Sequence, residues 1–250
     1  MTTTANPSAQ LKAVILAAGV GSRIRPLTDE RPKTLLTVGT RTILERMLTT
    51  LQRCGIEDTL IIAGYLGEKI ESFVSEHFGD MNIEFLTNTQ YQNTNTAYSL
   101  MLAEAFIGGA GFVKFDGDVV FDERILRKLL AEVDGSYLCI DRNIQLEAEE
   151  VKVSLTDGSR IALVSKSLAP AQAIGESIGI ERISASTGSM LFERLHAMMK
   201  DPANRQDYYE AAYESLIADG VAFHAIDISG LAWTEIDTRH DLDLATGLFA

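Results

Sequence analysis

Over the first 135 residues, short apolar runs alternate with longer segments in which apolar residues recur every three or four positions. The runs predict strands buried on both faces, and the recurring pattern predicts amphipathic helices. Thr42 and Glu45 have the spacing of a capping box that opens the first helix, and Gly55 suits its end. The expected strands are 13–16, 59–63, 83–86 and 112–115. This alternation predicts an α/β fold with a Rossmann-like, doubly wound, mostly parallel sheet and helices on both faces.

From residue 136 onward the pattern changes. Residues 151–155 and 160–164 alternate apolar and polar positions around Asp157-Gly158, which predicts an antiparallel hairpin. Together with the extended segment 173–184, the hairpin is interpreted as a small antiparallel layer over the sheet edge, within residues 141–184. The remaining expected elements are helices over 187–200 and 208–219, strands near 221–226 and 232–236, and a last helix from Thr238 that packs Leu242, Leu244 and Leu248.

The chain has 250 residues, 46% of them hydrophobic, which permits a substantial core. We expect one domain over residues 11–250, behind a disordered tail of residues 1–10 that lacks the positive end and apolar centre of a signal peptide. No apolar run reaches membrane-spanning length, so no membrane partner is expected. Cys54 and Cys139 lie in apolar contexts, which favours buried free thiols. These features predict a cytoplasmic protein.

The formal net charge of −13 argues against nucleic acid as a partner, because a phosphate backbone calls for a basic surface. The charge is unevenly spread, since residues 1–53 hold eight Lys and Arg against three Asp and Glu. An acidic protein with a basic first quarter suits a small polyanionic ligand that is held locally. The sequence leaves the choice between a monomer and a homodimer open.

Residues 16–33, which read LAAGVGSRIRPLTDERPK, form the strongest candidate site. They follow the first buried strand, and Gly19 and Gly21 remove side chains where the backbone must turn or approach a ligand. Arg23 and Lys33 bring cations to the same loop, so the stretch has the parts of a phosphate cradle. The third glycine of a dinucleotide fingerprint and the Gly-Lys-Ser/Thr of a P-loop are both absent, which excludes these two sites.

The order L-A-A-G-x-G-S-R, P-L-T and P-K resembles the signature of the nucleotidyltransferases that activate sugar phosphates and phosphocholine. The resemblance covers residues 11–250 and implies the nucleotide-diphospho-sugar transferase type of fold. It also implies that Arg23 and Lys33 act as catalytic cations that neutralise a nucleoside triphosphate. The implied nucleotide contacts are Leu16, Ala17, Ala18, Gly19, Gly21, Asn88 and Asn95.

The same resemblance implies Mg²⁺ as the cofactor. In this family, a Gly-Asp after the fourth strand and a late Asp-Thr/Ser-x-x-Asp-Leu carry the metal aspartates, which fall here on Asp118 and Asp237. Oxygen ligands suit Mg²⁺, and Glu235 lies two positions before Asp237 on the same side of a strand as a third candidate. The alternative is that these aspartates only cap helices or turns. We favour that alternative for Asp116 and place it with the acceptor candidates.

The acceptor is indicated by the segment YQNTNTAYSL. It resembles the form in CTP:phosphocholine cytidylyltransferases and in cytidylyltransferases for aminoalkylphosphonates, whereas hexose-activating relatives carry a different sequence there. Lys166 falls where sugar-phosphate members place a lysine that contacts the acceptor phosphate, although a surface lysine after a strand is also unremarkable. We count Lys166 among the catalytic candidates.

Two further observations concern an amine on the acceptor. Glu147, Glu149 and Glu150 suit a primary ammonium, and no tryptophan near 145–152 offers a choline cage. Asp207 and Glu210 have capping-box spacing, which leaves Tyr208 or Tyr209 to face a cation. The expected acceptor contacts are Asp116, Glu150, Lys152, Glu176 and Tyr209.

The predicted reaction joins a nucleoside triphosphate, with CTP favoured, to phosphocholine or to an aminoalkyl phosphate or phosphonate such as 2-aminoethylphosphonate, and releases pyrophosphate. The enzyme alternative is a hexose-1-phosphate nucleotidyltransferase. The non-enzyme alternative is a nucleotide-binding regulatory module without activity. The joint presence of Arg23, Lys33, Asp118 and Asp237 speaks against that module.

Overall fold

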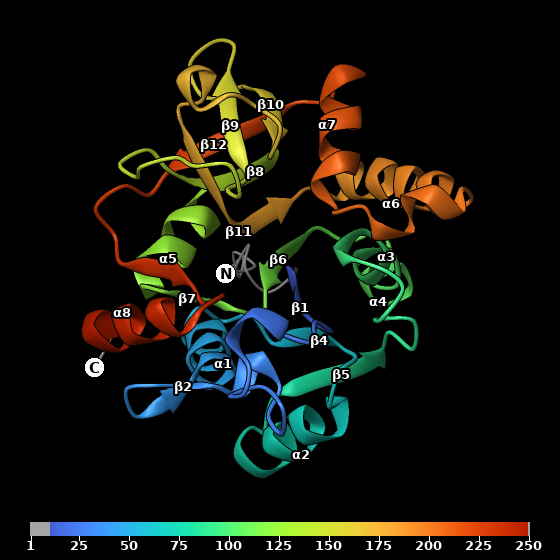
Figure 1. Ribbon diagram of the computed structural model, residues 1–250. Coiled ribbons are helices and arrows are strands. Elements are labelled where there is room, and N and C mark those ends of the chain that lie inside the picture. Colours follow the sequence, from blue (N-terminus) through green and yellow to red (C-terminus); the bar gives the residue numbers. More distant parts are fainter. Residues whose placement is uncertain (1–10, 250) are drawn as a thin grey trace, which may run out of the picture.

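The computed structural model describes residues 11–249, which contain a nine-stranded sheet with helices on both faces (Figure 1). The strands of this sheet are β1 (Lys12–Ala17), β4 (Asp58–Ala63), β5 (Asn82–Thr87), β6 (Phe112–Asp116), β8 (Ser136–Asp141), β9 (Lys152–Leu155), β10 (Ile161–Ser165), β11 (Gly175–Ile183) and β12 (Phe223–Asp227). Strands β6, β1, β4 and β5 are neighbours in that order and pair in parallel. The mostly parallel α/β fold is therefore confirmed.

Strand β11 reverses the direction of the sheet. It pairs antiparallel with β8 along one edge, and with β9 and then β6 along the other. Each of its nine residues is buried. The expected antiparallel strands of residues 141–184 are present, but β11 bonds them into the main sheet, so they extend the sheet and do not form a layer over its edge.

Helices cover both faces of the sheet because the central strands are apolar on both sides. The helices are α1 (Ile43–Arg53), α2 (Gly67–His77), α3 (Thr96–Met101), α4 (Glu104–Ile107), α5 (Glu123–Ala131), α6 (Ala185–Met199), α7 (Glu210–Ala218) and α8 (Arg239–Phe249). Helices α1 and α5 lie on one side of the sheet, and α3, α4 and α6 lie on the other (Figure 1). In β1, Ala13 and Ile15 belong to the apolar cluster that includes α1, α2 and α5, whereas Val14 and Leu16 belong to the cluster that includes α3, α4, α6 and α7.

Local capping signals fix several helix starts. The Thr42 Oγ1 accepts from the Glu45 N–H at 3.1 Å, and the Glu45 carboxylate accepts from the Thr42 N–H, so the expected capping box is confirmed. The expected box of Asp207 and Glu210 is wrong. Asp207 ends the preceding 3₁₀ turn, and α7 begins at Glu210 without a side-chain cap. Glu210 is thereby free to face a cavity.

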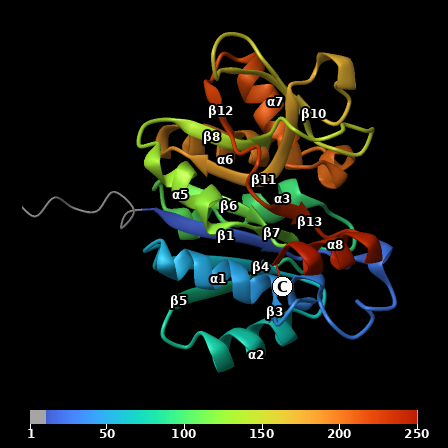
Figure 2. The same cartoon turned by 90° about the vertical axis from the view of Figure 1, so that its left-hand side faces the viewer.

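Helix α8 lies beside a two-stranded sheet of β7 (Val119–Phe121) and β13 (Trp233–Glu235), as Figure 2 shows. A second small sheet pairs β2 (Thr37–Val38) with β3 (Arg41–Thr42). Helix α8 packs through Leu242, Ala245 and Phe249. The prediction that Leu244 and Leu248 pack inward is wrong, because both leucines lie on the opposite helix face and are exposed.

Cys54 and Cys139 are free thiols, as expected, but only Cys139 is buried and Cys54 is half-buried. Among the described residues, no helix combines the length and the apolar character that crossing a membrane requires. The predicted tail of residues 1–10 lies outside the described residues.

Candidate active site

A cavity of about 400 Å³ opens at the carboxyl ends of β1 and β6, which is the edge where parallel sheets place ligands. Its loop end is formed by residues 16–33 and 88–99, and its far end by residues 149–151, 166, 176–179 and 208–210. The expected site residues that line it are Leu16, Ala18, Gly19, Gly21, Arg23, Lys33, Asn88, Asn95, Asp116, Asp118, Glu150, Lys166, Glu176, Tyr209, Glu235 and Asp237.

At the loop end, short polar contacts hold the glycine turn in one shape. Gly21 adopts φ +64°, a left-handed conformation that favours glycine. The Thr28 hydroxyl donates to the carbonyl of Gly21 at 2.8 Å, and the Tyr65 hydroxyl donates to the carbonyl of Thr28 at 2.9 Å. Within residues 11–249, the N–H groups of Gly19 and Gly21 have no backbone acceptor. They can therefore donate to an anionic ligand.

Three carboxylates meet beside this loop. The antiparallel pair of β7 and β13 brings the segments together, and the Ile236 N–H donates to the carbonyl of Asp118 at 3.0 Å. One carboxylate oxygen each of Asp118, Glu235 and Asp237 lies within 4.8 Å of the others. The carboxylate of Asp241 accepts from the backbone N–H of Asp237 at 3.0 Å and fixes the last of the three.

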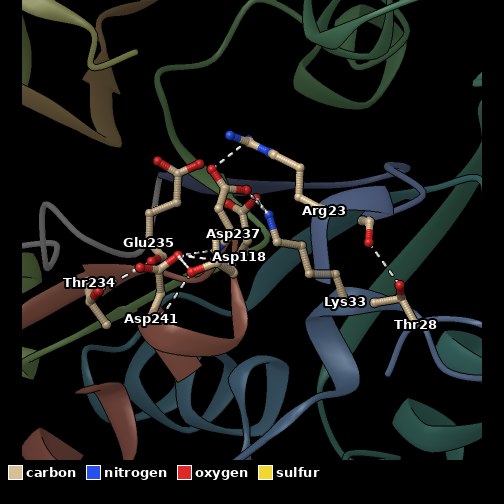
Figure 3. Close-up of polar contacts among 10 residues, drawn as sticks. Arg23, Thr28, Lys33, Asp118, Thr234, Glu235, Asp237 and Asp241 are labelled. Carbon is tan, nitrogen blue, oxygen red and sulfur yellow. Dashed lines mark hydrogen bonds and ion pairs between the residues drawn. The ribbon is translucent and has the colours of Figure 1, made fainter. Parts of the chain in front are cut away.

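Two cations balance this cluster (Figure 3). The Lys33 Nζ lies 2.7 Å from Oδ2 of Asp118 and 2.5 Å from Oδ1 of Asp237, and the Arg23 Nη2 lies 2.5 Å from Oδ2 of Asp237. Burial alone would lower the pKa of Lys33, but the two aspartates raise it above its ordinary value. Burial acts to raise the pKa of Asp237, yet Lys33 and Arg23 hold it below its usual range.

Glu235 is the least neutralised of the three carboxylates. Its desolvation in the cluster and the charges of Asp118 and Asp237 raise its pKa well above the ordinary value of a glutamate. The set fits a hard divalent cation, since all three donors are carboxylate oxygens. The ammonium of Lys33 already lies between two of them, which shows that these oxygens accept a cation there.

The floor of the far end is a buried polar network. Lys114 in β6 is fully buried, and its Nζ lies 2.8 Å from Oε2 of Glu181 and 3.2 Å from Oδ1 of Asp116. Lys114 and Glu181 are direct partners in the antiparallel pair of β6 and β11. The Lys114 Nζ also lies 3.6 Å from the ring centroid of Tyr209, whose hydroxyl donates to Oδ2 of Asp116 at 2.7 Å. Burial raises the pKa of Asp116, and Lys114 opposes this shift.

Gly179 lets β11 pass close to this network. It adopts φ +73°, and a Cβ atom at this position would lie 2.2 Å from Oδ2 of Asp116. Only glycine fits there, because both the backbone conformation and the space exclude a side chain.

The family model described as Nucleotidyl transferase matches residues 12–136, which hold the glycine loop, the cations and Asp118. The chain belongs to the nucleotidyl transferase family. The resemblance drawn from the sequence signature is therefore confirmed, and the two cations and three carboxylates occupy one wall of the cavity of this nucleotidyl transferase.

Two curated relatives carry informative names. The CMP-5'-(3-aminopropyl)phosphonate synthase of Streptomyces rubellomurinus is 31% identical over 96% of this chain, and the chain spans 39% of that relative's length. The 2-aminoethylphosphonate cytidylyltransferase of Lancefieldella rimae is 25% identical over 92% of this chain and 89% of its own. The solved CTP:phosphocholine cytidylyltransferase of Streptococcus pneumoniae superposes with a TM-score of 0.79 at 22% identity, over 96% of this chain and all of that one, which shows a shared fold.

Four residues of this nucleotidyl transferase that were expected to contact the nucleotide or the acceptor make contacts within the protein. Ala17 packs in the core and does not line the cavity. Lys152 is 1% exposed, and its Nζ donates to the carbonyls of Glu147, Ala148 and Glu150, so it holds that segment and the prediction of a direct acceptor contact is wrong.

Asn88 and Asn95 line the cavity, but their side chains form hydrogen bonds with neighbouring parts of the chain. The Asn88 amide donates to Thr94 and Ser99 at 3.1 Å, and its carbonyl oxygen accepts from the Gln90 N–H. Asn95 caps α3. Both side chains shape the loop that closes the cavity, and a nucleotide contact by either stays a prediction.

Sequence reasoning missed Lys114, Glu181 and Glu210. The first two carried a signal, since each is a charged residue flanked by apolar residues within a strand (FVKFD and SIGIERI). A charge in such a place is rarely buried without a partner, so two such strands indicate a buried ion pair. Glu210 carried no such signal, because its spacing from Asp207 matched that of a capping box.

Proposed function

We propose that the protein transfers a cytidylyl group from CTP to a phosphate or phosphonate acceptor that carries an amine. The observation that carries this proposal is one cavity that joins a glycine loop with two cations, a cluster of three carboxylates and a far end rich in acidic groups. The relatives named for (3-aminopropyl)phosphonate and 2-aminoethylphosphonate support an amine on the acceptor.

In this reaction, an oxygen of the acceptor phosphate attacks the α-phosphorus of CTP. The bond between the α-phosphorus and the bridging oxygen breaks, and pyrophosphate leaves with its electron pair. The reaction needs no protein nucleophile, so the residues position the reactants and neutralise charge. The backbone of residues 16–19 would hold the base and ribose, and Arg23 and Lys33 the triphosphate. Lys166 is exposed at the far end and would bind the acceptor phosphate.

Asp118, Glu235 and Asp237 would hold Mg²⁺, which supplies positive charge to the phosphates when bound. The Lys33 ammonium contacts oxygen atoms of the same two aspartates, and its third N–H donor is left for a phosphate oxygen.

Pyrophosphate release tests the proposal. CTP, UTP, dTTP and GTP are each paired with 2-aminoethylphosphonate, phosphoethanolamine, phosphocholine and glucose-1-phosphate, with Mg²⁺ present. We expect CTP with an amine-bearing acceptor to exceed every pairing with glucose-1-phosphate by more than about tenfold in kcat/KM. Preference for the hexose phosphate would overturn the proposal in favour of a hexose-1-phosphate nucleotidyltransferase. Nucleotide binding without release from any pairing would favour the regulatory module.

A further inference from the structure

The aromatic rings at the far end of the cavity already contact lysine side chains of the protein. Tyr209 is 2% exposed, its ring faces the Lys114 ammonium and its hydroxyl donates to Asp116. Tyr208 is 45% exposed, and the Lys166 Nζ lies 4.6 Å from its ring centroid. Since both rings face lysines, they do not form the open aromatic cage that a quaternary ammonium needs.

Two carboxylates at the same end lack such partners. Glu176 in β11 lines the cavity and is 7% exposed, and within residues 11–249 its carboxylate makes no hydrogen bond or ion pair. The lysine beside it in the sheet, Lys152, donates to backbone carbonyls instead. Glu210 also lines the cavity, and its Oε2 is shielded from water without a hydrogen-bond partner among the described residues.

An ionised carboxylate without water or a partner is costly, so it either keeps a proton or binds a cation. Burial raises the pKa of Glu176 to about 8, with Glu150 and Asp141 adding to the shift and Lys152 and Lys166 opposing it. Burial raises the pKa of Glu210 to about 7, with Asp116 adding to it and Lys114 and Lys166 opposing it. Both groups gain from a cation that enters the cavity.

We propose that Glu176, together with Glu210, binds the ammonium group of the acceptor, and that this ammonium is a primary one. The inference rests on the proposed cytidylyl transfer and narrows its acceptor. A primary ammonium offers three N–H donors to carboxylate oxygens, whereas a quaternary ammonium offers none and depends on aromatic faces. The far end presents unpaired carboxylates and occupied rings, which selects the primary amine over choline.

The first test is a methylation series with CTP: phosphoethanolamine, its N-methyl and N,N-dimethyl derivatives, and phosphocholine. We expect kcat/KM to fall at each step and to be at least about tenfold lower for phosphocholine than for phosphoethanolamine. If phosphocholine is the better acceptor, the inference is wrong while the proposed function stands. If glucose-1-phosphate exceeds the whole series, the proposed function itself fails.

The second test assigns the effect to the carboxylates. For 2-aminoethylphosphonate against n-propylphosphonate, in which a methyl group replaces the ammonium, the wild type should prefer the amine. Glu176→Gln should raise KM for the amine about ten- to a hundredfold and remove most of this preference, and Glu210→Gln should do so to a smaller extent. Glu193→Gln, on the exposed side of α6, is the matched control and should change neither value. An unchanged amine preference in both variants, with melting temperatures as in the wild type, would overturn the assignment.

Discussion

The two ends of the cavity are built in opposite ways. At the loop end, the cations are long side chains whose partners can be exchanged: Arg23 is 58% exposed and Lys33 13%, and both pair with carboxylates near the surface. At the far end, Lys114 is fully buried with Glu181 and held under Tyr209. The loop end can give up its ion pairs to a ligand, whereas the network under the far end has to stay intact for the fold.

Of the variants that test this difference between the two ends, Lys114→Met should have the largest effect, and the effect should be on stability. It leaves the buried carboxylates of Asp116 and Glu181 without their cation, and loss of one partner in a buried pair costs about 3–5 kcal/mol. Urea denaturation should show a loss of this size in the free energy of unfolding, against no change for the exposed Lys200→Met. The double variant Lys114→Met/Glu181→Gln should recover part of the loss. If Lys114→Met is as stable as the wild type, the buried network does not contribute to the stability of the fold in this way.

Asp118→Asn and Asp237→Asn test the loop end. Asparagine keeps the shape of the side chain and loses its charge, so metal-dependent turnover should fall by about 10²–10³-fold or more, while CTP binding partly survives through Arg23 and Lys33. Calorimetry gives the binding, and pyrophosphate release with a Mg²⁺ titration gives the turnover. Asp243→Asn, an exposed aspartate paired with Arg239, is the control. Normal turnover in both variants would refute the metal assignment.

Lys33→Ala and Arg23→Ala should lower turnover about ten- to a hundredfold each, because a charge-assisted contact to a phosphate contributes about 1.5–3 kcal/mol. Their melting temperatures should change little in comparison with Lys114→Met. The Arg23 side chain in particular is 58% exposed, and an ion pair with such an exposed partner adds at most about 1 kcal/mol to stability. Full activity in either variant would remove that cation from the reaction.

The smallest expected effect is a pH dependence of the far end. Glu176 has a pKa raised to about 8, so below pH 8 it holds a proton that an incoming ammonium must displace. The KM for an amine-bearing acceptor should therefore fall about tenfold between pH 6.5 and 8.5, while the amine itself, with a pKa near 10, stays charged. Glu176→Gln should flatten this profile for the same amine-bearing acceptor.

The sequence alone predicted the sheet, the glycine loop and the cluster of Asp118 and Asp237, because these depend on local apolar runs and on a long, specific motif. It could not predict how the side chains share partners. Tyr209 was expected to face a ligand cation, but the chain's own Lys114 occupies its ring. Lys152 was expected to contact the acceptor, but its Nζ donates to backbone carbonyl groups of the chain. Such outcomes depend on pairings between strands far apart in the chain, such as β6 with β11.

The position of Lys33 has a consequence for the resting protein. With Arg23, it gives Asp118 and Asp237 two resident counter-ions, so the charges of these aspartates are matched without any ion from solution. A divalent ion that enters would compete with this tethered ammonium for the same two aspartates, so its net gain is smaller than for an unpaired cluster. The fold should thus be indifferent to chelators, and the metal should be held more tightly when a triphosphate is present to draw the lysine away.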